Sequence, residues 1–394
     1  MSSGRFIAVD GADTAAFAMK QIDPDVVAAY PITPQTEIVM KFSEYVANGE
    51  VKTRYVTVES EHSAMSACVA AAAAGARAMT ATAANGLALM WEILYIAASY
   101  RLPIIMGVAN RALSGPINIH GDHSDAMGAR DSGWVQLYSE NNQEVYDNYI
   151  MALKIAEHKD VMLPVMVNQD GFITSHSVEN VEPLTDEQVR DYIGKKPAHF
   201  KGLLTYGKPV TIGPLDLQDY YFEHKMQQHT AMQKVLPVIK EVQEDYFKKF
   251  NRKYEIIEKY KADDAEMVIV GMNSVMGTVK DLVDELREKG VKIGAIKPRV
   301  FRPFPKNEIA DILKNFKAVA ILDRADSFGS FAPLYAETLA AMYKFEKRPY
   351  IRSYIHGLGG RDTTMELLGT VANDLIKMKD SGEGHLSEAY LGVR

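Results

Sequence analysis

The sequence predicts an α/β protein with two open, mostly parallel sheets. β-rich runs alternate with helical stretches along residues 1–175 and again from residue 266. The runs are short and nearly continuous in apolar residues, which is typical of parallel strands covered by helices on both faces. A stretch of different composition, residues 176–262, separates the two regions, and the regions do not resemble each other. We therefore divide the chain into residues 1–262, with a connector from about residue 176, and residues 263–394.

Composition excludes several classes of protein. The net charge of −7 over 394 residues argues against a general nucleic-acid surface. The most apolar stretch is interrupted by Arg77, Asn85 and Glu92, so we expect no membrane span. The single cysteine, Cys68, allows neither an internal disulfide nor a cysteine-ligated cluster within this chain, and it fits a cytoplasmic location.

The first region alternates strand and helix. We expect helices at Asp10–Lys20, Thr36–Val46, Ser63–Gly75, Leu87–Tyr100 and Asn142–His158, and strands at Val26–Tyr30, Tyr55–Val58, Ala78–Ala83, Pro103–Val108 and Val161–Val167. Asn85-Gly86 is a turn signal, and Asn110–Gly133 reads as a long polar loop. In the connector, the charges between Gln228 and Lys261 predict a helix with a solvated face.

The second region continues this alternation. We expect strands at Met267–Met272, Val291–Ile296, Ala318–Asp323 and Tyr350–Tyr354, and helices at Val275–Lys289, Lys306–Leu313, Phe331–Lys344 and Met365–Lys379. The glycine-rich loop His356–Thr364 follows a strand and would suit a phosphate or the close approach of another chain. Asp380–Arg394 reads as a surface tail.

Glu61 is the first candidate site residue. It follows the run Tyr55–Val58 and precedes the small-residue helix Ser63–Gly75. A carboxylate in a first helical turn interacts favourably with the helix dipole, and this alone would account for it. The functional alternative is that a helix without bulky side chains approaches a flat ligand closely and leaves Glu61 poorly hydrated. Burial raises the pKa of a carboxyl group, which suits a proton relay.

Thr33 is the second candidate. It lies in the segment AYPITPQTE, where Pro31 and Pro34 surround Ile32-Thr33 just after a predicted strand. Loops beyond the carboxyl ends of strands are the usual ligand sites of open α/β sheets. An ordinary strand–helix turn would also explain this segment.

Arg111 is the third candidate, at the start of the loop Asn110–Gly133. His120, Asp122, His123 and Asp125 in this loop suggest a metal, but their spacing matches no standard site, and we expect none. A guanidinium matches a carboxylate bidentately, so Arg111 is better suited to an anionic group, with the rest of the loop as a lid.

Taken together, the segments resemble the α subunits of the 2-oxoacid:ferredoxin oxidoreductases, and most closely those of the pyruvate type. The resemblance covers about residues 8 to 375 and is carried by YPITPQT, VESEHSAMSA, TATAANGLALMWE, NRALSGPINIHGDHSD, RDSGW, NNQEVYD, VMVNQDGF, FRPFP and HGLGGRD. It implies a thiamine-diphosphate pyrimidine-binding domain, followed by a domain of the transketolase C-terminal type.

The resemblance also implies roles for individual residues. Glu61 would contact the aminopyrimidine ring of thiamine diphosphate and activate the cofactor, with Pro31, Ile32 and Asn85 also against it. Arg111 and Thr33 would bind the 2-oxoacid. The reaction implied is oxidative decarboxylation of pyruvate to acetyl-coenzyme A and CO2, with electrons passing to ferredoxin in anaerobic metabolism.

Other parts of such an enzyme are missing from this sequence. It has no diphosphate-binding Gly-Asp-Gly segment with magnesium ligands and no cluster cysteines. The resemblance therefore implies β, γ and δ subunits that supply Mg²⁺ and [4Fe–4S] clusters, and coenzyme A as co-substrate. Alternatives remain open: a 2-oxoisovalerate or other 2-oxoacid enzyme, a non-catalytic assembly subunit, or a dinucleotide-dependent dehydrogenase, although the glycine fingerprint of the last is absent.

Overall fold

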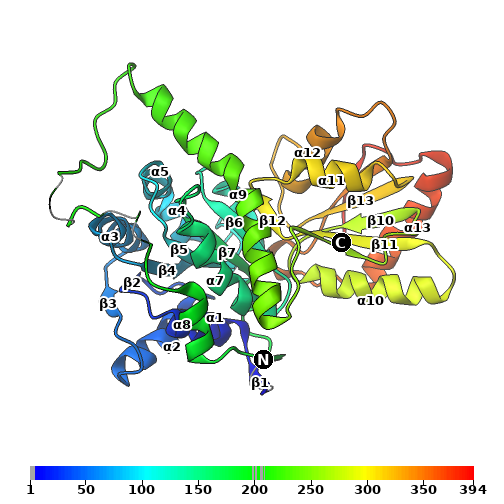
Figure 1. Cartoon of the computed structure of the whole chain (residues 1–394). Helices are drawn as coiled ribbons and strands as arrows, with labels where there is room; N and C mark the ends of the chain where they lie inside the picture. Colours follow the sequence, from blue (N-terminus) through cyan, green and yellow to red (C-terminus); the bar gives the residue numbers. More distant parts are fainter. Residues whose placement is uncertain (1–4, 198, 200–201, 205–206, 208) are drawn as a thin grey trace.

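Two sheets, each covered by helices on both faces, stand side by side in the molecule (Figure 1). The computed structural model describes residues 5–197, 199, 202–204, 207 and 209–394. The remaining residues, some of which belong to the predicted connector, lie outside this description. The predicted α/β class with two mostly parallel sheets is confirmed.

The first sheet has seven strands. In spatial order they are β12 (Val300–Arg302), β6 (Val135–Ser139), β7 (Val165–Asp170), β5 (Ile105–Asn110), β4 (Ala78–Thr82), β2 (Val26–Ala29) and β3 (Arg54–Thr57). All neighbours are parallel except β12, which pairs antiparallel with β6. A small two-stranded sheet, β1 (Ile7–Val9) with β8 (Glu179–Val181), lies apart from it.

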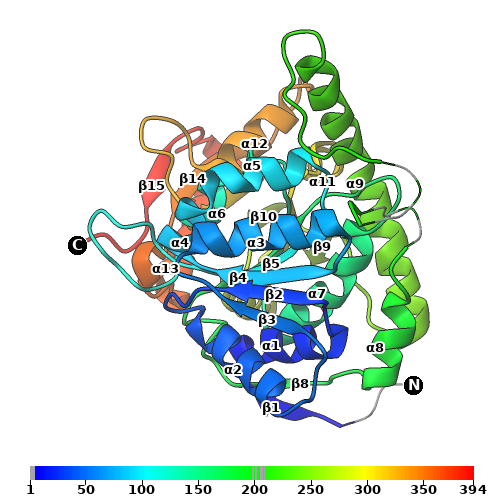
Figure 2. The same cartoon turned by 90° about the vertical axis from the view of Figure 1, so that its left-hand side faces the viewer.

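Helices cover both faces of the first sheet (Figure 2). One face carries α3 (Glu61–Ala74), α4 (Ala84–Leu89) and α5 (Trp91–Ser99), and the other carries α1 (Gly11–Ile22), α2 (Thr36–Ala47) and α7 (Asn142–Ala156). Successive side chains of a strand point to opposite faces. In β4, Ala78 packs under the first group of helices and Met79 under the second, which is why the strands are apolar at consecutive positions.

The helix α3 lies close over the sheet because its buried side chains are small. Ala64, Cys68 and Ala72 are fully buried on its inner face. The side chain of Ser60 caps the helix by accepting a hydrogen bond from the backbone N–H of Ser63 at 3.2 Å. This cap begins the helix at Glu61, two residues earlier than the sequence predicts.

The second sheet has six strands. In spatial order they are β15 (Glu388–Tyr390), β14 (Tyr350–Ile355), β13 (Ala318–Asp323), β10 (Met267–Val270), β11 (Ile293–Pro298) and β9 (Ile257–Tyr260), the last antiparallel. The helices α10 (Val275–Glu288) and α13 (Met365–Ser381) cover one face. The helices α11 (Lys306–Leu313) and α12 (Pro333–Met342) pack against side chains of the other face.

The two sheets are tied together through shared elements. β12 belongs to the second half of the chain but pairs with the first sheet and extends it. One apolar core also continues from the first sheet to the face of the second sheet that α11 and α12 cover. A buried ion cluster adds to this contact: the Lys297 ammonium on β11 lies 2.8 Å from Glu144 on α7 and 2.6 Å from Glu258 on β9. The domain boundary at residue 262, which the sequence suggested, stays a prediction.

The connector contains the predicted helix, but its bounds were predicted wrongly. The helix α9 runs from Tyr221 to Phe250, so it begins earlier and ends earlier than the predicted range from Gln228 to Lys261. Asn251 takes a left-handed conformation (φ 57°), which ends the helix. The chain then extends into β9, which pairs with β11, so the charges after residue 250 belong to a strand and its lead-in.

The region of the predicted turn Asn85-Gly86 is also different. Both residues lie inside α4, and the predicted helix Leu87–Tyr100 is interrupted at Met90, between α4 and α5. The chain turns one step earlier, at Ala84, which has a φ of 43°.

Other predicted helices and strands differ from those in the structure. β6 was missed because its buried positions include Gln136, whose amide donates to the Ala126 carbonyl at 2.8 Å. The loop Asn110–Gly133 contains a short helix, α6 (Ser124–Gly128). β7 begins at Val165 and not at Val161, and a further helix, α8 (Asp186–Ile193), lies in the connector.

The predicted tail Asp380–Arg394 is not a simple tail. It holds β15, which pairs with β14 in parallel and extends the edge of the second sheet. Within the described residues, no helix combines the length and the apolarity needed to cross a membrane.

Replacing Lys297 with Met should destabilise the fold strongly. Burial opposes the ionisation of Glu144, but Arg299 and Lys297 lower its pKa to about 2. Removing one partner of a buried ion pair typically costs about 3–5 kcal/mol. We expect that loss in the free energy of unfolding at pH 7, measured by urea denaturation of the full chain. The difference from the native chain should narrow as the pH falls below about 4.3, because protonated Glu144 no longer needs the cation.

Lys259→Met is the matched control. Lys259 also lies on a strand of the second sheet, but its ion pair with Asp263 at 2.7 Å is largely exposed. Such pairs contribute about 0–1 kcal/mol. Equal effects of the two substitutions would show that the buried cluster has no special role in joining the two sheets.

Candidate functional site

The candidate residues lie at one edge of the first sheet. Four parallel strands lie side by side in this sheet, in the order β5, β4, β2 and β3. Because they run in the same direction, the chain leaves all four at the same edge. Thr33 follows β2, Glu61 follows β3, Asn85 follows β4 and Arg111 follows β5. Ligands bind open α/β sheets at this carboxyl edge.

Glu61 is buried at the start of α3. Its exposed fraction is 6%, and its side chain makes no hydrogen bond with another of the described residues. Burial raises the pKa of the Glu61 carboxyl. Apart from its own backbone N–H, no donor of the described residues is bonded to this carboxyl group, so it is available to a ligand.

Gly86 allows Glu61 to occupy this position. A Cβ atom on Gly86 would come within 2.6 Å of Glu61 Oε1 and 2.5 Å of Thr82 Oγ1. Real side chains do not tolerate such distances, so the backbone of α4 approaches Glu61 only because residue 86 is glycine. The Thr82 hydroxyl is fully buried and has no hydrogen-bond partner among the described residues. Glu61 and Thr82 thus place two side-chain oxygens beside one glycine, and that of Thr82 has no partner among the described residues.

Asp125 joins the loops that follow β4 and β5. Its carboxylate is 3% exposed and accepts hydrogen bonds from the backbone N–H groups of Ala84 (2.9 Å), Arg111 (3.0 Å) and Ala126 (2.7 Å). The Asn110 side-chain amide is a fourth donor, at 3.0 Å. Burial raises the pKa of Asp125 to about 6, although these donors favour the ionised form. The carboxylate therefore holds the start of α4 against the start of the loop Asn110–Gly133, which we call the Arg111 loop.

The Arg111 guanidinium is held by backbone carbonyl groups. Nε donates to the carbonyl of Asn118 at 2.9 Å and Nη1 donates to that of Thr33 at 2.8 Å. The residue is 6% exposed. Burial lowers the pKa of Arg111, with Asp125 opposing this shift, but an arginine keeps its charge at physiological pH. The structure thus brings Arg111 and the loop of Thr33 together.

The remaining candidates lie at the surface of this edge. Thr33 and Pro31 are exposed, and Ile32 is half-buried, with its N–H donating to the Gln35 side chain at 3.2 Å. Asn85 is exposed and accepts hydrogen bonds from the N–H (3.2 Å) and hydroxyl (3.0 Å) of Ser114. Asn85 therefore contacts the Arg111 loop directly.

The four residues that suggested a metal have other roles. His120 is exposed, while His123 is buried and its Nε2 lies 2.8 Å from Asp170 Oδ1. Asp122 Oδ1 accepts from the Ser124 N–H at 2.7 Å, and Asp125 is occupied by its four donors. In the described residues, the acidic cluster spaced for an ion is Glu140, Glu144 and Glu258, and Lys297 contacts all three.

Sequence reasoning missed the supporting residues. Gly86 was read only as half of a turn signal, and Asp125 only as a possible metal ligand. Thr82 carries no sequence signal because it lies within an apolar strand. Gly86 had the best available signal, since a glycine inside a helix often marks a close approach.

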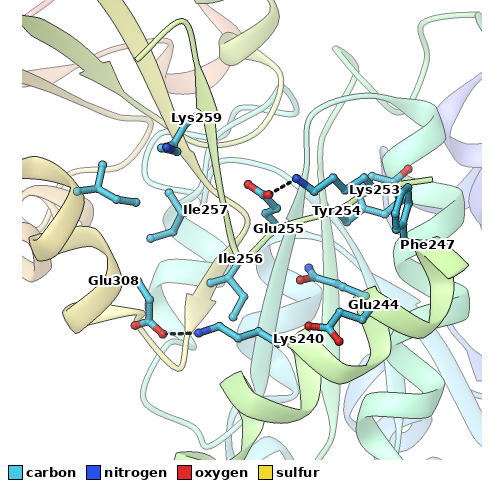
Figure 3. A pocket seen from close by; sticks show the side chains of 12 residues that line it. Lys240, Glu244, Phe247, Lys253, Tyr254, Glu255, Ile256, Ile257, Lys259 and Glu308 are labelled. Atoms are coloured by element: carbon cyan, nitrogen blue, oxygen red, sulfur yellow. Dashed lines mark hydrogen bonds and ion pairs between the residues drawn. The ribbon is translucent and has the colours of Figure 1, made fainter. Parts of the chain in front are cut away.

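A cavity of about 410 Å³ lies elsewhere, between α9, the chain before β9, and α11 (Figure 3). Four of its charged lining residues form two ion pairs: Lys240 lies 3.0 Å from Glu308, and Lys253 lies 2.6 Å from Glu255. No candidate site residue lines it, so it is separate from the edge described above.

Comparison with known proteins agrees with this arrangement. Residues 17–244 match the family model of the pyruvate flavodoxin/ferredoxin oxidoreductase thiamine-diphosphate-binding domain, and residues 265–368 match pyruvate:ferredoxin oxidoreductase core domain II. Pyruvate synthase subunit PorA of Thermotoga maritima is 57% identical over 98% of both chains. The chain belongs to the pyruvate:ferredoxin oxidoreductase α-subunit family. The family predicted from the sequence is confirmed.

Other members of the family and a solved structure are also similar. Ketoisovalerate oxidoreductase subunit VorA of Pyrococcus abyssi is 45% identical over 95% of this chain and 94% of its own. A structure of 2-oxoglutarate:ferredoxin oxidoreductase from Magnetococcus marinus, with 2-oxoglutarate, coenzyme A and succinyl-CoA bound, superimposes with a TM-score of 0.74 at 19% identity. This chain covers 65% of that one, and at such identity the likeness concerns the fold alone.

Replacing Gly86 with Ala should disable the site without unfolding the chain. The added methyl group would displace the Glu61 carboxyl, and a misplacement of about 1 Å costs roughly 10- to 100-fold in rate. We expect that loss in 2-oxoacid-dependent reduction of a one-electron acceptor by the assembled enzyme.

Gly369→Ala serves as the control. Gly369 lies inside α13, and a Cβ there meets no atom within 4 Å. This variant should keep its activity. A Gly86→Ala enzyme as active as Gly369→Ala would contradict the close packing of Glu61 against α4.

Proposed function

We propose that this chain is the catalytic α subunit of a multi-subunit pyruvate:ferredoxin oxidoreductase. That enzyme converts pyruvate and coenzyme A to acetyl-coenzyme A and CO2, with electrons passing to ferredoxin. The observation that carries the proposal is the presence, at the same edge of a parallel sheet, of the buried Glu61 carboxyl, to which no other described residue is bonded, and of the buried Arg111 guanidinium.

The residues around Glu61 fit the aminopyrimidine of thiamine diphosphate. A flat ring with nitrogen donors and acceptors suits the buried Glu61 carboxyl and the Thr82 hydroxyl, which has no partner among the described residues. Pro31, Ile32 and Asn85 are the further residues we assign to the ring. When bound, thiamine diphosphate supplies an electron sink for decarboxylation of the 2-oxoacid.

The contribution of Glu61 is to hold a proton at its carboxyl oxygen and to orient the ring. Burial raises the pKa of Glu61 toward neutral pH. A carboxyl group exchanges protons more efficiently when its pKa lies nearer the working pH. Its helix is fixed by the Ser60 cap, and α4 excludes water from one side of it.

The contribution of Arg111 and Thr33 is to bind the substrate. Arg111 would form a charge-assisted pair with the 2-oxoacid carboxylate. The exposed Thr33 hydroxyl lies on the loop whose carbonyl holds Arg111, so it would reach the same substrate oxygens.

The rest of the reaction would require partner subunits. The single cysteine of this chain cannot ligate a [4Fe–4S] cluster, and we assign the clusters, Mg²⁺ and the diphosphate site to β, γ and δ subunits. We further propose that the complex is cytoplasmic and that ferredoxin is its electron acceptor.

The substrate could also be 2-oxoisovalerate, because relatives of that specificity are 45% identical to this chain. The higher identity, 57%, is to a pyruvate synthase subunit and favours pyruvate. A comparison of kcat/KM for the two 2-oxoacids in the assembled enzyme separates these functions. If no 2-oxoacid supports reduction of a one-electron acceptor by the assembled enzyme, an assembly role is the function that remains for this chain.

Glu61→Gln should lower kcat by roughly 10²- to 10⁴-fold, the range that a positioned acid or base contributes. Glutamine keeps the volume of glutamate but cannot exchange the proton, so the complex should still assemble. The measurement is steady-state turnover with pyruvate and coenzyme A.

Glu59→Gln is the control for this variant. Glu59 is an exposed carboxylate two residues away, bonded to the Ser63 hydroxyl at 2.8 Å. It should retain turnover. Normal turnover in Glu61→Gln would remove Glu61 from the proposed role.

Arg111→Ala should raise the KM for pyruvate by roughly 10- to 100-fold, through loss of a charge-assisted pair. Arg111→Lys keeps the charge but loses the planar fork, so its KM should lie between those of the native enzyme and the alanine variant. An unchanged KM in both variants would mean that another group holds the carboxylate.

A further inference from the structure

The glycine-rich loop after β14 adopts a backbone shape that other residues rarely take. Gly357, Gly359 and Gly360 have φ values of 64°, 61° and 77°. All three lie in the left-handed region, where side chains cause strain. The proposed reaction assigns no role to this loop of the second sheet.

This loop packs directly against the Arg111 loop of the first sheet. The Gly359 carbonyl accepts from Asn118 Nδ2 at 3.1 Å, and the Gly360 N–H donates to the Gly121 carbonyl at 2.8 Å. A Cβ on Gly359 would lie 2.5 Å from Asn118 Nδ2, and one on Gly360 would lie 2.4 Å from His120 Cβ. The glycines thus permit the contact between the two loops.

Asn118 connects this contact to Arg111. Its side chain binds the Gly359 carbonyl and also accepts from the His120 N–H at 2.7 Å, while its own carbonyl accepts from Arg111 Nε at 2.9 Å. A guanidinium has five N–H donors. Two are committed to the carbonyls of Asn118 and Thr33, and the other three, both on Nη2 and one on Nη1, have no hydrogen-bond partner among the described residues. The end of the guanidinium fork is therefore free for a carboxylate.

The segment that carries Asn118 has little packing of its own. Its neighbours Ile117 and Ile119 are 77% and 40% exposed. Because these two isoleucines are not buried, hydrogen bonds to the glycine loop and to Arg111 contribute much to its position, together with the Ala112 N–H on the His120 carbonyl (3.1 Å) and the His120 ring against Phe172.

We infer that the glycine loop of the second sheet, acting through Asn118, orients the Arg111 guanidinium and so sets the affinity for the 2-oxoacid carboxylate. Asn118 is a positioning residue, since it acts through the bond between its carbonyl and Arg111. The inference rests on the proposed function, in which Arg111 binds that carboxylate. Through this contact the second sheet contributes to substrate binding, although it lies far from Arg111 along the chain.

The test measures KM and kcat for pyruvate in the assembled enzyme. Asn118→Ala removes the link to Gly359, and Gly359→Ala pushes Asn118 away. Each should raise KM by roughly 3- to 10-fold while kcat changes less than about 2-fold, because a bound substrate still reorients the guanidinium. A KM that stays unchanged in both variants would overturn the inference.

Gly290→Ala is the matched control for Gly359→Ala. Gly290 has a similar left-handed conformation (φ 81°), but a Cβ there meets no atom within 4 Å. It therefore carries the same backbone strain without the displaced neighbour, and its KM should stay at the native value. A rise in KM equal to that of Gly359→Ala would attribute the effect to general destabilisation and overturn the inference.

The double variant Asn118→Ala with Arg111→Ala separates a positioning role from a structural one. If Asn118 acts through Arg111, its substitution should change KM by less than about 2-fold once Arg111 is gone. A full additional rise in the double variant would contradict the inference. If Arg111→Ala alone raises KM and Asn118→Ala does not, the inference fails and the proposed function stands. If Arg111→Ala leaves KM unchanged, the inference fails together with the proposed role of Arg111, and another group holds the carboxylate.

Discussion

One buried carboxylate, Asp125, holds the candidate site together. Its two oxygens accept four N–H groups from three parts of the chain: the start of α4, the end of β5 with Arg111, and α6 itself. The start of α4 brings Gly86 against Glu61, and the end of β5 carries Arg111. Because a buried carboxylate is stable only when its oxygens are satisfied, the two halves of the site cannot separate without exposing a charge to an apolar environment. The spacing between Glu61 and Arg111 depends on this one group.

The second sheet supports the same edge from the other side. Asp170, at the end of β7, lies 3.1 Å from Arg324 and accepts from the Ser274 N–H at 3.0 Å, and both of these residues belong to the second sheet's loops. Burial opposes ionisation of Asp170, but Arg324 and His123 hold its pKa well below its usual range. The Asp170 carboxylate thus joins β7, the Arg111 loop through His123, and the second sheet. The site is built at a junction of two sheets, although its candidate residues all come from one.

Local patterns in the sequence predict most strands and helices, because apolar runs and caps act over a few residues. They also predict Glu61, Thr33 and Arg111, since these residues stand in motifs that resemble a known family. The non-local features were not predictable: β12 crosses to the other sheet, β15 extends an edge, and Gln136 is a buried polar residue inside β6. The role of Asp125 depends on burial, which four aligned N–H groups make tolerable, and spacing alone does not reveal such an arrangement.

The central claim is that Glu61 faces the aminopyrimidine of thiamine diphosphate whose diphosphate is held by a partner subunit. The most direct test is a structure of the assembled enzyme with that cofactor bound. The account predicts a Glu61 carboxyl oxygen within hydrogen-bond distance of a ring nitrogen, roughly 2.6–3.2 Å, with Arg111 open toward the same cavity. A cofactor bound far from Glu61, with that side chain in solvent, would contradict the account.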